Sequence, residues 1–266
     1  MVNKKSTIFS NIIFWLVIIF LYFPVLLLAF YSFTDASMLG QSKHFSLDNY
    51  VTLFTESTLT SMMISTLVLA MVVSVISTLL GTVGAVSVYY SGNKVKSFVD
   101  FTNQIPVVNA DVVTGFSVCI LLIVFCHMDK ATCIPLVLAL TTLCTPFVYL
   151  SVYPRLLQMD DALFEAALDL GCNKKQAFFK VVIPQISGGI INGFLTAVTL
   201  SLDDYFITTY TKPASFDTIS TYVVNATRGA QTEIKTALWA LSTVILLFVI
   251  AFVVFTNMGD RHEMLE

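Results

Sequence analysis

Three carboxylates interrupt the apolar stretches of this 266-residue chain. Asp111 stands alone, whereas Asp203 and Asp204 are adjacent within TLSLDDYFITTY, residues 199–210. Each ionised Asp near the middle of a bilayer costs about 2.5–3.5 kcal/mol. Protonation, water in a cavity, a partner's cation or a cationic ligand would lower that cost. The carboxylates are therefore the first candidates for functional residues, and cation binding is the chemistry they suit.

The composition indicates an integral membrane protein. The chain is 56% hydrophobic and 12% charged, with a mean hydropathy of +0.83, whereas soluble domains are about 45–50% apolar and about 25% charged. No basic run suggests nucleic-acid binding. The three histidines are isolated, and no Ser–His–Asp or Cys–His grouping is present. We therefore expect no catalytic site in this chain.

A membrane-spanning helix needs about 20 apolar residues. Six stretches qualify, at roughly 9–33, 59–89, 101–126, 133–153, 185–210 and 236–257. The predicted fold class is therefore an all-α membrane protein with six transmembrane helices, forming a single transmembrane domain over 1–266. Nine Lys and Arg residues fall on the side of the N-terminus and five on the other. This imbalance places both termini in the cytoplasm.

The five cysteines predict neither a disulfide framework nor a zinc site. Their number is odd, they lie within or beside apolar stretches, and no C-x-x-C occurs among them. Three are spaced by sevens, which would also fit a metal-binding stripe. We expect small buried thiols that pack like hydrophobic side chains, and no metal site. The cysteines are Cys119, Cys126, Cys133, Cys144 and Cys172.

The cytoplasmic connection at about 154–184 carries two predicted amphipathic helices. Asp160 and Asp161 suit the N-terminus of the first helix, and Gly171 suits a left-handed residue after its end. Asn173 and Gln176 have the spacing of a capping box for the second helix, which Pro184 is expected to close. The apolar Phe164, Phe178 and Phe179 are expected to face the cytoplasm or a partner protein. Such a loop either folds back on its own membrane domain or presents a helix to a groove.

The same loop resembles the EAA motif of ABC importer permeases with the type I, MetI-like fold. The motif is matched by Glu165-Ala166-Ala167, three further residues, Gly171 and a tail that ends at Ile183-Pro184. Val181 departs from the usual Ile. The S-L-D-D run most closely resembles the second permease subunit of spermidine/putrescine importers. In that family the motif forms a coupling helix that docks on a cytoplasmic ATPase.

The resemblance implies a heterodimer with a second permease, two copies of the ATPase and an extracytoplasmic polyamine-binding protein, in the inner membrane of a bacterium. It assigns ATPase docking to Glu165, Ala166, Ala167, Gly171 and Pro184. No G-x-x-x-x-G-K-[ST] sequence occurs in the chain, so ATP and Mg²⁺ are expected on the partner ATPase and no cofactor on this chain.

Helical spacing assigns the carboxylates to different faces. Asp203 continues a polar stripe that includes Asn192, Thr196 and Thr199, because these residues are spaced by four, three and four. Asp204 shares a neighbouring face with Ser201, Tyr205 and Thr208. In the third stretch Asp111 is flanked by Asn109, Thr114 and Ser117. The predicted substrate path consists of Asp111, Ser201, Asp203, Asp204 and Tyr205.

The resemblance supports the path role for the three Asp residues and less strongly for Ser201, whereas Tyr205 is chosen because its ring can contact a cation. Alternatively, Asp203 or Asp204 caps a broken helix or pairs with an Arg on the second permease. The predicted function is polyamine import. Other possibilities are an ABC permease for ferric ion or an aminophosphonate, and a proton-coupled secondary transporter.

Overall fold

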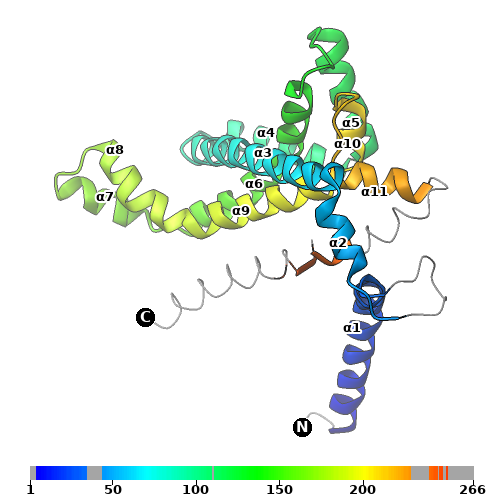
Figure 1. The fold of residues 1–266 in the computed structure, drawn as a ribbon. Helices are drawn as coiled ribbons and strands as arrows, with labels where there is room; N and C mark the ends of the chain where they lie inside the picture. The colour runs from blue at the N-terminus through cyan, green and yellow to red at the C-terminus, as the bar shows by residue number, and fades with distance from the viewer. Residues whose placement is uncertain are drawn as a thin grey trace. The chain divides into compact units, whose positions relative to one another are not determined.

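The computed structural model describes residues 4–34, 44–109, 111–228, 240–244, 246–247 and 250. Within these ranges the chain is helical and has no strand beyond a single bridge between Thr34 and Phe45. Figure 1 shows the helices. Their bounds are α1 Lys4–Ser32, α2 Asp48–Thr55, α3 Ser57–Tyr89, α4 Asn93–Val108, α5 Asp111–Cys119, α6 Ile134–Leu157, α7 Asp161–Asp169, α8 Lys174–Ala177, α9 Ile183–Asp203, α10 Phe206–Thr211 and α11 Ile219–Arg228.

The chain divides into two compact units. One consists of Met1–Ser61 and Asn225–Glu266, and the other of Met62–Val224. In the first unit, α2 is tied to the end of α1 by Asn49, whose side-chain amide donates to the carbonyl oxygens of Ser32 at 3.2 Å and Thr34 at 2.8 Å. The prediction of one domain over 1–266 stays a prediction.

The second unit is built on the pair α6 and α9. Gly189 and Gly193 allow these helices to approach closely. A Cβ on Gly189 would lie 2.9 Å from the carbonyl oxygen of Ser151, and one on Gly193 would lie 3.1 Å from Cγ1 of Val148. Figure 1 shows α7 and α8 at one end of this pair and α5 and α10 at the other. The pair therefore sets the distance between the predicted docking loop and the carboxylates.

Four helices are long and apolar enough to cross a membrane, and a bent pair brings the number to five if the pair is one span. The four are Ile13–Ser32, Ser57–Tyr89, Ile134–Leu157 and Lys174–Asp203. The all-helical membrane fold is thus confirmed for the described residues. The predicted span at 236–257 lies largely outside them, so the sixth span stays a prediction.

Two predicted spans are wrong as continuous helices. The stretch 101–126 is divided into α4 and α5, whose axes differ by 107°. Asn109 leaves the helical conformation at the end of α4, and its side-chain amide donates to Oγ1 of Thr114 at 3.2 Å. The stretch 185–210 ends as a helix at Asp203 and restarts at Phe206. Both breaks occur at the predicted carboxylates.

The role assigned to Pro184 in closing a helix is also wrong. Helix α8 continues through a π-helical turn, Phe178–Val182, into α9. Pro184 is the second residue of α9 and directly follows this wide turn. The wide turn brings the N–H of Ile183 to the carbonyl oxygen of Phe178, five residues earlier. The chain therefore enters the membrane on one long helix from Lys174.

We predict that Gly189→Ala destabilises the protein by about 1–3 kcal/mol, because the added methyl group overpacks the contact of α9 with α6. The measurement is thermal unfolding of the detergent-solubilised protein. Gly188→Ala is the matched control, since its Cβ would have no neighbour closer than Nη2 of Arg155 at 4.0 Å. Equal unfolding temperatures for the two variants would contradict the close approach.

Candidate functional site

The carboxylate of Asp204 caps helix α10. Its Oδ2 accepts hydrogen bonds from the backbone N–H of Thr208 at 2.7 Å and from the Thr208 hydroxyl at 2.9 Å. Its Oδ1 accepts a longer bond from the N–H of Ile207, at 3.4 Å. These donors replace part of the hydration that the carboxylate loses in a bilayer. The alternative that one of the paired acids caps a broken helix is therefore realised by Asp204.

Asp203, unlike Asp204, lies on an exposed face of α9. The packed face of α9 contains Ile186, Gly189, Gly193 and Ala197, whereas Asn192, Thr199 and Asp203 are exposed and Thr196 is half-buried. The hydroxyls of Thr196 and Thr199 bond to carbonyl oxygens of their own helix, at 2.9 and 3.0 Å. The structure therefore brings the predicted polar stripe together, on a side of α9 that the described residues leave largely uncovered.

Asp111 occupies the first turn of α5 and is exposed. Helix α5 packs on α10 where Gly115 meets Ile207, and the rings of Phe116 and Tyr210 lie 5.8 Å apart in an edge-to-face contact. The carboxylates of Asp111 and Asp204 thus lie at the starts of two helices that pack on each other.

Ser201 and Tyr205 differ in their surroundings. Ser201 is buried, and its hydroxyl has no hydrogen-bond partner among the described residues. Tyr205 is half-buried, and its ring makes an edge-to-face contact with Phe206 at 5.2 Å. Neither side chain is as open to a passing solute in this chain as that of Asp203.

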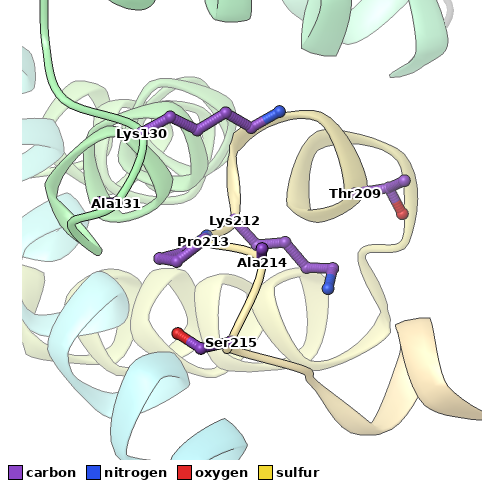
Figure 2. A pocket seen from close by; sticks show the side chains of 7 residues that line it. All are labelled: Lys130, Ala131, Thr209, Lys212, Pro213, Ala214 and Ser215. Atoms are coloured by element: carbon purple, nitrogen blue, oxygen red, sulfur yellow. The ribbon is translucent and has the colours of Figure 1, made fainter.

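A cavity of about 620 Å³ lies at the α10 end of the unit. Figure 2 shows its lining, with Lys130 from the connection before α6 and Lys212 from the end of α10. The ammonium group of Lys212 donates to Oδ1 of Asp217 at 2.6 Å and to the carbonyl oxygen of Phe216 at 2.8 Å. Two lysines make this cavity unsuitable for a polycation, and none of the predicted path residues lines it.

The loop between α6 and α9 has the predicted local structure. Oδ1 of Asp160 accepts from the N–H of Ala162 at 3.0 Å, and Asn173 and Gln176 form both bonds of a capping box. Gly171 has a φ of +88°, a conformation that side chains with a Cβ disfavour. These three predictions are confirmed.

The exposure of the loop was predicted only in part. Glu165, Ala166 and Gly171 are exposed, but Ala167 is buried by the chain itself. Phe164 and Phe178 pack against the core, so their prediction as outward-facing residues is wrong, whereas Phe179 is 68% exposed. Leu170, 86% exposed, is the most open apolar side chain of the loop among the described residues. The outward surface thus combines small, apolar and acidic groups.

The cysteines form no site in the part of the chain that the structure describes. All five are free thiols, and no group of three His, Cys, Asp or Glu side chains has the arrangement of a metal site there. Cys144 is buried as predicted, but Cys126 and Cys133 are exposed. The prediction of buried thiols is wrong for these two because they flank the exposed turn before α6.

Comparison with known proteins identifies the family. Residues 1–262 match the family described as the binding-protein-dependent transport system inner membrane component. The chain belongs to this family. Its members are membrane components of transport systems, which confirms the resemblance to importer permeases and the prediction of a transport subunit rather than an enzyme.

Several family members with assigned names resemble the chain over most of its length. It is 32% identical to the putrescine transport system permease protein PotI of Escherichia coli K12 over 234 residues, 85% of this chain and 82% of the relative. It is 26% identical to the spermidine/putrescine permease PotC of Haemophilus influenzae over 255 residues, 95% and 96% of the two chains. The PotC of E. coli K12 is 25% identical over 92% of this chain and 90% of its own.

One carboxylate of this permease was missed by the sequence analysis. Asp100 precedes the predicted third span by a single residue, and it lies on α4, where its Oδ1 accepts from the hydroxyl of Tyr149 at 2.7 Å. The polar residues Lys96, Asp100 and Gln104 recur at every fourth position. That spacing was the available signal for a polar face on this helix.

We predict that Asp204→Ala destabilises the permease by about 0.5–2 kcal/mol, the usual cost of losing a helix N-cap. Thermal unfolding in detergent measures this loss. Asp203→Ala is the matched control because no hydrogen bond to its carboxylate occurs within the described residues, and its effect should stay within about 0.5 kcal/mol. An Asp203→Ala variant that is less stable than Asp204→Ala would contradict the assignment.

Proposed function

We propose that this chain is a transmembrane subunit of an ATP-binding-cassette importer that moves spermidine or putrescine into the cytoplasm. In this proposal the chain has six transmembrane helices, both termini are cytoplasmic, and the protein resides in the inner membrane of a bacterium. The names of PotI and PotC support the substrate class, since both relatives are polyamine permeases. The alignments cover most of the lengths of both relatives.

One observation carries the substrate assignment. The six apolar stretches contain three carboxylates and no Lys or Arg. Asp203 lies at the end of an exposed polar stripe, and Asp111 begins a neighbouring helix. A polyamine carries several positive charges on a narrow alkyl chain, so it matches an uncovered row of acids better than an anion or a neutral solute would. We assign the path to Asp111, Ser201, Asp203, Asp204 and Tyr205.

The division between binding and capping refines this assignment. Asp204 already accepts three hydrogen bonds, so it contributes mainly negative potential to the path. Asp203 has no such donors among the described residues and is exposed. We therefore assign direct contact with the substrate to Asp203 and Asp111, with Asp204 fixing the helix break between them.

The exposed loop surface is the proposed contact with a separate cytoplasmic ATPase, which binds ATP and Mg²⁺. Glu165, Ala166 and Gly171 are its exposed residues, and Ala167 is buried beneath them. Pro184 lies at the start of α9, the helix that transmits movement to the membrane. A second permease completes the heterodimer, two copies of the ATPase drive it, and an extracytoplasmic binding protein delivers the polyamine. Movement of the loop would rock α6 and α9 as one body, because these helices are packed through glycines.

Other transport functions explain fewer of these observations. A permease for ferric ion or an aminophosphonate would share the loop and the fold, but the polyamine names of the relatives do not favour it. A proton-coupled secondary transporter would use the same acids, yet it would give no role to the exposed surface around Glu165 and Leu170. Transport by the chain alone, driven by a proton gradient without ATP, would support that function.

We expect Asp203→Asn to impair ATP-driven uptake of putrescine and spermidine without preventing assembly, since the amide keeps the shape of the side chain but loses its charge. The Asp111→Asn, Asp203→Asn, Asp204→Asn triple variant should lose uptake more severely. Both are measured on the complete transporter in proteoliposomes, with Asp129→Asn on the exposed turn before α6 as the control. Normal uptake by the triple variant would rule out the acidic path.

We also expect Gly171→Val to reduce the amount of ATPase that co-purifies with the permease. A side chain at a φ of +88° costs about 1–2 kcal/mol, and it distorts the turn that follows α7. Gly84→Val is the control, because a Cβ there would have no neighbour within 4 Å. Unchanged co-purification and uptake for Gly171→Val would contradict the docking role of the loop.

A further inference from the structure

A shallow, open groove follows one side of α4, and its lining residues all come from this helix and its C-terminal end. Its two adjoining cavities, of about 540 and 480 Å³, share Phe101 and Gln104 in their walls. The first is also lined by Lys96 and Asp100, and the second reaches Asn109. Asn109 is two residues before Asp111. The groove therefore leads from the proposed path to a fourth carboxylate, Asp100.

Asp100 is held by a buried tyrosine. The hydroxyl of Tyr149, which is 2% exposed, donates to Oδ1 of Asp100 at 2.7 Å. Asp100 forms no ion pair within the described ranges, whereas Lys212 and Asp217 do pair with each other. The carboxylate is thus oriented by one neutral donor, and its other oxygen is available to a second donor, for which an ammonium group is well suited.

Two aromatic rings complete the surroundings of this carboxylate. The rings of Tyr149 and Tyr153 are stacked with centroids 5.1 Å apart, and the ammonium nitrogen of Lys96 lies 5.3 Å from the centroid of Tyr153. That distance is typical of a cation–π contact. The hydroxyl of Tyr153 is buried and has no hydrogen-bond partner in the described part of the chain. The second oxygen of the Asp100 carboxylate and the Tyr153 ring that Lys96 contacts are the two groups here that suit a primary alkylammonium group.

Lys96 already supplies such a group. Its side chain ends in the same primary alkylammonium that terminates a polyamine, and it stands one helical turn from Asp100. The lysine is therefore a tethered cation that contacts the aromatic part of the site while leaving the carboxylate unpaired. An incoming ammonium group would bind Asp100 and push the lysine away by charge repulsion, which also weakens the retention of the substrate.

We propose that Asp100 is a second ammonium-binding residue of the polyamine path, on the cytoplasmic side of Asp111, and that Lys96 promotes release from it. This inference rests on the proposed function, which supplies the substrate class and the cytoplasmic position of Lys94 and Lys96. A polyamine moves along the groove of α4 from the acids at the helix breaks to Asp100. From Asp100 the polyamine is released into the cytoplasm.

The test is ATP-driven uptake of radiolabelled putrescine by the complete transporter in proteoliposomes. Asp100→Asn should lower the maximal rate by about tenfold, the effect of one hydrogen bond to a charged group, whereas Asp100→Glu should retain most of it. Tyr149→Phe keeps the carboxylate and should change the rate by less than about threefold. Asp48→Asn, on the exposed start of α2, is the charge-matched control.

A double variant separates substrate binding from internal charge balance. If Asp100 only offsets the charge of Lys96, the Lys96→Gln, Asp100→Asn variant recovers the uptake that Asp100→Asn loses. If Asp100 binds the substrate, the double variant stays as slow as Asp100→Asn. The double variant restores the net charge of the helix, so it also tests whether the loss in Asp100→Asn comes from that charge.

Recovery in the double variant would overturn the proposal. Equal losses in Asp100→Asn and Tyr149→Phe would do so as well, because they would reduce the pair to a structural tie between α4 and α6. Uptake by the wild-type transporter tests the proposed function separately. A wild-type transporter that takes up neither putrescine nor spermidine would contradict the proposed function, whatever the variants do.

Discussion

A carboxylate within a bilayer must find hydrogen-bond donors or a cation, and the structure meets this constraint in different ways along the chain. Asp204 accepts hydrogen bonds from two backbone N–H groups and one hydroxyl of α10. Asp100 accepts one from Tyr149. Asp203 and Asp111 are exposed on the surface of the chain. Since no Lys or Arg occurs in the six apolar stretches, no ion pair within these stretches balances the exposed acids.

The helix breaks also help to stabilise the carboxylates in the membrane. A continuous helix would leave Asp204 without backbone donors, because every N–H group in its interior is already used. Ending α9 at Asp203 and restarting at Phe206 frees the N–H groups that Asp204 binds. The break between α4 and α5 likewise leaves Asp111 in a first turn, where the helix dipole favours an anion. Polar backbone at membrane depth is tolerated where it lines a cavity or is covered by protein.

Local features were predictable from the sequence, and features set by distant contacts were not. The cap at Asp160, the capping box of Asn173 and Gln176, and the left-handed Gly171 each depend on residues within one turn. The break between α4 and α5 was missed, and the break at Asp204 was raised only as an alternative. Hydropathy counts apolar residues and does not detect a side chain that competes for backbone N–H groups. Asp100 was missed because its partner Tyr149 is 49 positions away in the sequence.

The central claim is that the exposed carboxylates of this permease meet the ammonium groups of a polyamine. It is tested most directly by a structure of the assembled transporter with putrescine trapped in the membrane region. The account predicts substrate nitrogen atoms within about 3 Å of the carboxylates of Asp203 or Asp111, the distance of a charge-assisted hydrogen bond. Asp203 and Asp111 both paired with Arg or Lys side chains of the second permease, with the substrate elsewhere, would contradict it.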